Sequence, residues 1–253
     1  MTTRERIACL GAGRMGRGIA VVFAYVGHAV DVIDFKPRDA AGLETLRADV
    51  MREVTETLRM LAQLGMFHEQ DVATIAQRIS VIGHDDAAHA LGRATVVFEG
   101  IPEVVAMKRE AFASASAMTA PDAIIASTTS TILVDDLSDS VDRPERFLNA
   151  HWLNPAYLVP LVELSPGKRT DPAVTERLKQ LLESVGKVPV VCAARPGYIV
   201  PRIQALAMNE AARMVEEGVA SAEDLDKAIK YGFGFRFAVL GLLEFIDWGG
   251  GDI

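Results

Sequence analysis

The chain has 253 residues, half of them hydrophobic and 24% charged, the balance of a soluble globular protein of roughly one to two domains. A chain of this length and composition buries enough apolar surface to fold without disulfide bonds, which excludes small disulfide-rich proteins and disordered proteins. Asp and Glu (34) outnumber Lys and Arg (26), giving a net charge of −8. The charge argues against a nucleic-acid partner, because a phosphate backbone recruits basic surfaces.

Cysteine usage and hydropathy predict the compartment. Cys9 and Cys192 lie in apolar runs with no Cys or His nearby at ligand spacing, which is typical of buried, reduced thiols and predicts no metal site. No stretch reaches the roughly 18 apolar residues of a membrane span. The N-terminus runs directly into an apolar segment at residue 7, leaving no room for a targeting sequence. We therefore expect a soluble, cytoplasmic protein that does not bind a membrane.

Short apolar segments alternate with segments of helical period as far as about residue 192. Strands are expected at residues 6–10, 29–34, 79–82, 95–99, 123–127, 147–152, 161–164 and 188–192. Helices are expected at residues 15–26, 38–64, 69–77, 103–118 and 172–185. This alternation predicts an α/β fold with a doubly wound, mostly parallel sheet. The long segment 38–64, followed by 69–77, is interpreted as a helical hairpin inserted between strands.

The pattern changes after residue 192. Arg195-Pro196-Gly197 is a turn signal and no strand is expected beyond it, so we place a domain boundary near residue 194. Helices are expected at residues 198–217, at 221–231 with Ser221 as N-cap, and from about Phe235 to the glycines that follow Trp248. Residues 195–253 then form a small all-α C-terminal domain, which docks on residues 1–194 and a partner subunit unless the chain is truncated.

A glycine-rich motif lies between the first strand and the first helix. Gly11-Ala12-Gly13-Arg14-Met15-Gly16 matches G-x-G-x-x-G, in which the glycines make a tight turn, admit a pyrophosphate and allow close helix packing. Asp34, at the end of the second strand, would bind the adenosine ribose and repel a 2′-phosphate, so NAD is expected rather than NADP. Arg38 argues mildly against this, although its spacing better fits a helix start. The motif predicts a Rossmann-type NAD-binding domain.

One histidine stands apart from the other four. His151 ends a strand and opens a turn at the carboxyl edge of the sheet, where ligands bind. Glu163 follows twelve residues later inside an apolar run, where a carboxylate needs a partner such as an imidazolium. The pair is either a general base with its orienting carboxylate or a structural ion pair. The remaining histidines are expected at the surface: His28, His68, His84 and His89.

Several ordered motifs resemble those of the NAD-dependent L-3-hydroxyacyl-CoA dehydrogenases, over nearly the whole chain. They lie at residues 11–20, 98–103, 126–130, 151–155 with 163, and 196–200. The resemblance implies that His151 is the general base, oriented by Glu163, and that Ser130 hydrogen-bonds the substrate oxygen. It also implies that Asn154 contacts substrate and cofactor, and that Glu103 and Lys108 line the nicotinamide half of NAD. Alternatively, Glu103 is a first-turn helix acid and Lys108 a solvated charge.

The resemblance further implies a small-molecule substrate, a role in fatty acid metabolism and a homodimer, but three positions depart from the family pattern. Pro201 stands where the family usually has Asn, and Thr128 where Asn is common. Residues 232–241 replace a Gly-x-Pro-x-Gly-Pro turn, which looks like the gulonate 3-dehydrogenase and carnitine dehydrogenase branch. There Arg236 would pair with a substrate carboxylate; otherwise it is a surface arginine.

Three hypotheses therefore stay open. The protein oxidises a 3-hydroxyacyl-CoA, oxidises a free 3-hydroxy acid, or binds a dinucleotide without catalysis. The four residues His151, Glu163, Ser130 and Asn154 argue against the third. The chain also stops where family members usually continue with helices that complete the dimer, so a truncated chain is one interpretation.

Overall fold

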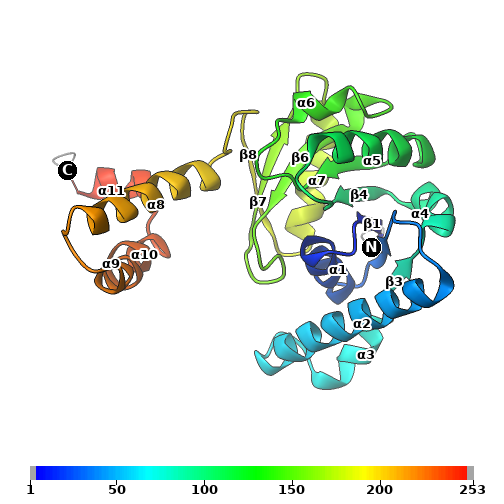
Figure 1. Ribbon diagram of the computed structural model, residues 1–253, viewed down its shortest axis with the longest axis horizontal. Helices are drawn as coiled ribbons and strands as arrows, with labels where there is room; N and C mark the ends of the chain where they lie inside the picture. Colours follow the sequence, from blue (N-terminus) through cyan, green and yellow to red (C-terminus); the bar gives the residue numbers. More distant parts are fainter. Residues whose placement is uncertain (1–3, 250–253) are drawn as a thin grey trace. The chain divides into compact units, whose positions relative to one another are not determined.

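The computed structural model describes residues 4–249, and the chain divides into two compact units between Ile199 and Val200. Unit 1 is an α/β structure and unit 2 is helical (Figure 1). The predicted fold class is thereby confirmed. The division falls five residues after residue 194, because the segment that includes Tyr198 and Ile199 is bonded to residues of unit 1.

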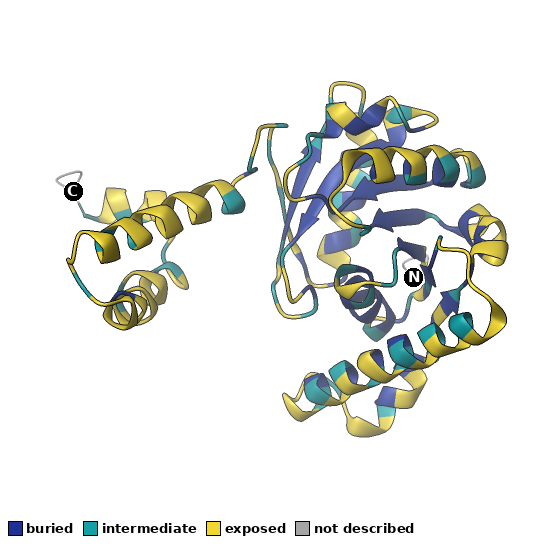
Figure 2. Ribbon diagram, viewed as in Figure 1, coloured by how far each residue is buried: buried dark blue, intermediate teal, exposed yellow. Residues whose placement is uncertain are grey.

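The sheet of unit 1 has eight strands in the order β3-β2-β1-β4-β5-β6-β7-β8. The strands are β1 (Arg6–Leu10), β2 (Ala29–Ile33), β3 (Ile79–Ile82), β4 (Val96–Glu99), β5 (Ile124–Ser127), β6 (Phe147–Trp152), β7 (Leu161–Pro166) and β8 (Val188–Val191). Neighbouring strands are parallel, except that β6 and β7 are antiparallel. The expected strands are confirmed to within two residues at each end, since central strands covered on both faces read as short apolar runs (Figure 2).

The helices of unit 1 are α1 (Arg14–Tyr25), α2 (Ala40–Gln63), α3 (Val72–Ala76), α4 (Ala87–Arg93), α5 (Val105–Met118), α6 (Val134–Ser138) and α7 (Pro172–Ser184). The 3-10 turns are Glu69–Asp71, His84–Asp86 and Pro144–Arg146. The helix expected at residues 69–77 is wrong in detail, because it consists of a 3-10 turn followed by the short α3. Helices α4 and α6 have seven and five residues, too few for their period to be read from the sequence.

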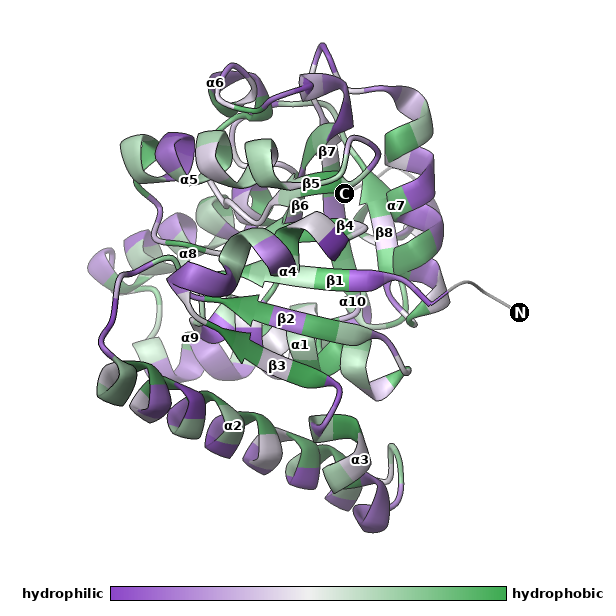
Figure 3. Cartoon of the chain, turned by 90° about the vertical axis from the view of Figure 1, so that its right-hand side faces the viewer, coloured by the Kyte–Doolittle hydropathy of each residue, from purple (hydrophilic) through white to green (hydrophobic). Residues whose placement is uncertain are grey.

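Two hydrophobic clusters cover opposite faces of the sheet. Along β1, Ile7 and Cys9 belong to one cluster, and Ala8 and Leu10 to the other, as the two-residue period of a strand requires. Side chains of α1, α2, α3 and α7 complete the first cluster, and those of α4, α5 and α6 complete the second. Polar and apolar residues alternate along α2 (Figure 3), whose apolar side packs into the first cluster. The inserted helical hairpin is therefore part of the core.

Unit 2 contains α8 (Val200–Glu216), α9 (Ala222–Ala228), a π-helical turn (Ile229–Phe233), α10 (Gly234–Phe237) and α11 (Leu242–Trp248). Ser221 caps α9 by accepting from the Asp224 N–H at 3.1 Å, as predicted. The single helix expected from Phe235 is instead α10 and α11, and the end of the predicted glycine stop, residues 250 and 251, lies outside the described residues. Arg236 of α10 lies 4.6 Å from the centre of the Phe245 ring.

Within residues 4–249, none of the helices combines the length and the apolar composition needed to cross a membrane.

Candidate active site

The glycine-rich loop connects β1 to α1. Gly11 has a φ of +100°, a conformation that favours glycine, and its N–H donates to the Ile33 carbonyl at 2.8 Å. A Cβ on Gly16 would lie 2.1 Å from the Gly11 carbonyl oxygen, so the close packing of helix and strand requires glycine there. A Cβ on Gly13, the N-cap of α1, would meet no described atom within 4 Å. The α1 N-terminus is therefore open to the diphosphate of a dinucleotide.

The other residues of this loop differ in their contacts. The Ala12 carbonyl accepts from Arg17 Nε at 2.7 Å, and Arg17 also pairs with Glu53 of α2. Met15 packs against the first core cluster. Arg14 is exposed at the first position of α1. The predicted contacts of Ala12, Arg14 and Met15 with the cofactor stay predictions.

A cavity of about 680 Å³ extends from this loop along the ends of the strands. It is lined by residues that include 11–13, 34–36 and 100–102. Asp34 is 7% exposed, and its Oδ2 accepts from Arg38 Nε at 2.5 Å. The expectation that Arg38 starts a helix is wrong, because α2 begins at Ala40 and Arg38 turns back to Asp34. The volume is in the range of cofactor pockets, and the open glycine loop and buried carboxylate at its rim fit an adenine dinucleotide.

His151 and Glu163 meet across the one antiparallel strand pair of the described sheet. They are direct partners in the register of β6 and β7, and His151 Nδ1 lies 2.7 Å from Glu163 Oε2. The two residues are 3% and 0% exposed. Glu163 Oε1 accepts from the Ile199 N–H at 2.8 Å, which fixes the carboxylate. In a neutral imidazole this contact assigns the ring proton to Nδ1 and leaves Nε2 as the acceptor, and Nε2 lies 3.0 Å from Ser130 Oγ.

Ser130 lies in a loop, residues 128–132, that follows β5 and is held by Glu103. Glu103 Oε1 accepts from the N–H groups of Ser130 (3.0 Å) and Thr131 (3.1 Å) and from the Thr129 and Thr131 hydroxyls. Burial opposes the charged form of Glu103, but these hydroxyl bonds and the charge of Lys108 outweigh it and hold the pKa of the carboxyl below its usual value. The alternative of a first-turn helix acid is wrong, since α5 begins at Val105.

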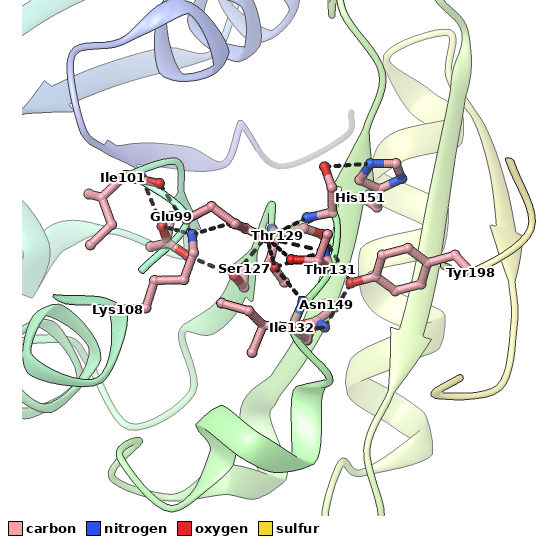
Figure 4. A network of polar contacts seen from close by, with 12 residues as sticks. Glu99, Ile101, Lys108, Ser127, Thr129, Thr131, Ile132, Asn149, His151 and Tyr198 are labelled. Atoms are coloured by element: carbon pink, nitrogen blue, oxygen red, sulfur yellow. Dashed lines mark hydrogen bonds and ion pairs between the residues drawn. The ribbon is translucent and has the colours of Figure 1, made fainter. Parts of the chain in front are cut away.

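Lys108 is buried in a polar network beneath this loop (Figure 4). It is 1% exposed, and its Nζ lies 2.6 Å from Glu99 Oε1 and 3.3 Å from Glu103 Oε2. Glu99 Oε2 accepts from Ser127 Oγ at 2.6 Å. The alternative of a solvated Lys108 is therefore wrong. The sequence-based prediction missed Glu99, although a carboxylate that ends an apolar strand nine residues before a lysine is a detectable signal.

The sequence-based prediction also missed Asn149 and Tyr198. The Tyr198 hydroxyl donates to the Thr129 carbonyl at 3.0 Å and accepts from Asn149 Nδ2 at 2.9 Å. Asn149 Nδ2 also donates to the Ile132 carbonyl. Asn149 lies within the strand expected at residues 147–152 and Tyr198 in the motif at residues 196–200, and only the folded chain joins them to the Ser130 loop.

The turn between β6 and β7 carries Asn154, which is exposed three residues after His151. Its predicted contact with substrate and cofactor stays a prediction. The same turn is tied down by Lys187, whose Nζ donates to the Ala156 carbonyl (2.5 Å) and the Val159 carbonyl (2.9 Å). Burial lowers the pKa of Lys187 to about 8.

Three of the four remaining histidines are exposed, as expected: His68, His84 and His89. The expectation of a surface His28 is wrong, because His28 is half-buried, with its ring edge-on to Phe23 and Nδ1 3.1 Å from the Glu5 carbonyl. Cys9 is buried, whereas Cys192 is only half-buried, and both are free thiols. Among residues 4–249, no group of three or more His, Cys, Asp or Glu side chains could hold a metal ion.

Comparison with known families decides the assignment. The model of the 3-hydroxyacyl-CoA dehydrogenase NAD-binding domain matches residues 6–195, and the model of the C-terminal domain of the same family matches residues 197–252. The chain belongs to the 3-hydroxyacyl-CoA dehydrogenase family. Its N-terminal part is accordingly an NAD-binding domain, and the protein is an NAD-dependent oxidoreductase of that family.

Individual members of the family differ in substrate. The chain is 34% identical, over 98% of its length and 77% of the relative, to 5-formyl-3-hydroxy-2-methylpyridine 4-carboxylate 5-dehydrogenase of Mesorhizobium japonicum. It is 33% identical, over 96% of its length and 79% of the relative, to 3-hydroxybutyryl-CoA dehydrogenase of Bradyrhizobium diazoefficiens. A crystal structure of a 5-formyl-3-hydroxy-2-methylpyridine 4-carboxylic acid 5-dehydrogenase aligns with a TM-score of 0.82 at 30% identity, covering 99% of this chain and 77% of the other.

Proposed function

We propose that the protein oxidises the 3-hydroxyl of an L-3-hydroxyacyl-CoA to the 3-ketoacyl-CoA, with NAD as cofactor, His151 as general base and Glu163 as its orienting group. The observation that carries this proposal is the contact chain from Glu163 through His151 to Ser130, in which Nδ1 of the imidazole faces the carboxylate and Nε2 faces the hydroxyl. It lies at the carboxyl end of β6, and the glycine loop lies at the carboxyl end of β1 in the same sheet. Family membership supports the same chemistry.

In this proposal a substrate hydroxyl is held by Ser130 Oγ and donates to His151 Nε2. His151 Nε2 takes the hydroxyl proton while the C3–H bond breaks, and NAD, when bound, supplies the acceptor for the hydride. The resulting imidazolium is stabilised by Glu163 Oε2, which the Ile199 N–H holds in place. In the reverse direction His151 returns the proton to the carbonyl oxygen. Glu103 would line the nicotinamide half of NAD, with the buried Lys108 behind it bound to its carboxylate, and Asn154 would contact substrate and cofactor.

A second candidate keeps this chemistry but replaces the thioester by a free hydroxy carboxylic acid. Two observations favour it. Pro201 provides no side-chain donor for an acyl carbonyl. The Mesorhizobium relative acts on a pyridine carboxylate and is as similar to this chain as the hydroxybutyryl-CoA enzyme.

One experiment tests both. NADH absorbance is followed with acetoacetyl-CoA and, separately, with small free 3-keto acids, for the wild type and for His151→Gln. Turnover of the thioester supports the first candidate, and turnover of free acids alone supports the second. We expect His151→Gln to reduce kcat by about 10² to 10⁴, the usual contribution of general acid–base catalysis. The control His89→Gln, at an exposed position of α4, should leave the rate unchanged. Wild-type turnover in His151→Gln would overturn the assignment of the base.

We further propose a homodimer, a cytoplasmic location and a role in fatty acid metabolism. Large apolar side chains exposed in unit 2 support a dimer: Leu206 (73% exposed), Leu243 (75%) and Trp248 (76%). The two free cysteines support a reducing compartment. Sedimentation equilibrium of the purified chain tests the dimer, and a monomer mass at micromolar concentration would contradict it.

A further inference from the structure

The loop that carries Ser130 is held from two sides. On one side Glu103 binds the N–H groups of Ser130 and Thr131. On the other side two carbonyl oxygens of the loop are bound by side chains from distant elements. The Thr129 carbonyl accepts from the Tyr198 hydroxyl (3.0 Å), and the Ile132 carbonyl accepts from Asn149 Nδ2 (2.9 Å). The two carbonyl contacts lie on either side of Ser130 in the sequence and therefore help to fix the position of its hydroxyl.

Tyr198 also contacts the general base through its ring. The phenol and imidazole rings are stacked with centroids 5.1 Å apart and an interplanar angle of 16°, within the range of favourable offset stacking. Figure 4 shows the hydroxyl of Tyr198 directed to Asn149 and the Ser130 loop, with the His151 ring beside it. One side chain thus contacts the ring of the general base and binds the carbonyl of Thr129, the residue that precedes Ser130.

The protonation of the Tyr198 hydroxyl and the backbone conformation of this residue both agree with a fixed position. The residue is 7% exposed, and burial raises the pKa of its hydroxyl, which therefore stays protonated and able to donate. Its φ is +43°, in the left-handed region. This conformation is unfavourable for any residue other than glycine, and it persists only where surrounding contacts impose it. The next residue, Ile199, donates its N–H to Glu163.

We propose that Tyr198 is a positioning residue of the hydride-transfer site: its hydroxyl fixes the Ser130 loop and its ring fixes the His151 imidazole, so that Ser130 Oγ and His151 Nε2 bind the same substrate oxygen. This inference rests on the proposed dehydrogenase function. It assigns to the tyrosine of the motif at residues 196–200 a role that a phenylalanine could fill only in part, because the hydroxyl makes the contact with the loop.

Tyr198→Phe is the informative variant, because it keeps the stacked ring and removes only the hydroxyl. We expect kcat to fall about tenfold with the Kd for NADH unchanged, since small displacements of positioning groups cost one to two orders of magnitude in rate. Tyr25→Phe is the matched control, as its ring lies beside Phe67 at the end of α1, and it should keep the wild-type rate. The double-mutant cycle with Ser130→Ala separates positioning from general stability. In the Ser130→Ala background, Tyr198→Phe should change kcat by less than about twofold.

Amide hydrogen exchange provides a readout that needs no substrate. Peptides that cover residues 129–132 should exchange at least about tenfold faster in Tyr198→Phe than in the wild type or in Tyr25→Phe. Two results together support the inference: Tyr198→Phe speeds amide exchange in the loop, and it lowers kcat only in the protein that retains Ser130. An equal loss of rate in both backgrounds, or unchanged exchange in the loop, would overturn it. If the wild type turns over no substrate, the proposed function fails, while the exchange result still decides whether Tyr198 holds the loop.

Discussion

Replacement of Glu163 by Gln removes the charge of the dyad while keeping its shape. Both oxygens of the fully buried Glu163 accept hydrogen bonds, Oε2 from His151 Nδ1 (2.7 Å) and Oε1 from the Ile199 N–H (2.8 Å). A glutamine amide has one accepting oxygen and an NH₂ group that only donates, so either the His151 N–H or the Ile199 N–H must face an N–H. A buried donor left without a partner costs about 1–3 kcal/mol, and loss of the charge weakens the remaining bond as well.

The glutamine lowers the rate by changing the tautomer of the His151 imidazole. If the Ile199 N–H keeps the amide oxygen, the amide NH₂ faces His151 Nδ1 and favours the tautomer with its proton on Nε2. That tautomer cannot accept the proton of the substrate hydroxyl. In a serine protease the corresponding change of Asp to Asn lowers kcat by about 10⁴. We expect kcat of Glu163→Gln to fall by about 10² to 10⁴.

The assay compares initial rates of NADH oxidation for the wild type, Glu163→Gln and Glu176→Gln, with the substrate that the wild type turns over. Glu176 is an exposed glutamate of α7 and serves as the control for loss of one negative charge. NADH titrations should give equal Kd values for all three proteins, because Glu163 is not among the residues that line the nucleotide cavity. A kcat within threefold of wild type in a folded Glu163→Gln protein would refute the reasoning and leave Glu163 with a structural role.

Two glycines of the phosphate loop should respond differently to the same added methyl group. Gly13→Ala should fold normally but raise the Kd for NADH at least about tenfold, because the methyl occupies space kept for the diphosphate. Gly16→Ala should lower the melting temperature, since its Cβ would overlap the Gly11 carbonyl oxygen; equal melting temperatures would contradict this. Lys187, with its pKa lowered from 10.5 to about 8, binds its proton less tightly in the folded than in the unfolded chain. Stability should therefore rise with pH between about 8 and 10.5, by at most about 3 kcal/mol. Urea unfolding of Lys187→Met should lack this rise, and parallel pH profiles of variant and wild type would refute the assignment.

The strands and the dyad residues are features that sequence alone can predict. Strands buried on both faces leave short apolar runs between helical segments, and the eight predicted strands match the sheet for that reason. A carboxylate inside such a run, as at Glu163, has few physical explanations besides a buried partner. His151 is identifiable because it ends a strand at the edge where ligands bind.

Contacts that depend on pairing between distant segments could not be predicted in this way. The Tyr198 hydroxyl and the Thr129 carbonyl are 69 positions apart, and nothing in the sequence links the polar run around Thr129 to Tyr198. The buried Lys108 was ambiguous because a lysine on a helix is usually solvated, and its burial follows from Glu99 on another element.

The antiparallel pair of β6 and β7 has a consequence for judging other chains of this kind. His151 and Glu163 face each other because they are opposite residues in one register of β6 and β7. A slip of one residue turns every side chain of a strand to the other face of the sheet. A deletion of one residue in β7 before Glu163 would therefore separate the pair while leaving both residues, and each recognisable motif, in the sequence. Such a chain would keep every motif residue but lack a working general base. The spacing from His151 to Glu163 therefore says as much about catalytic activity as the presence of the two residues.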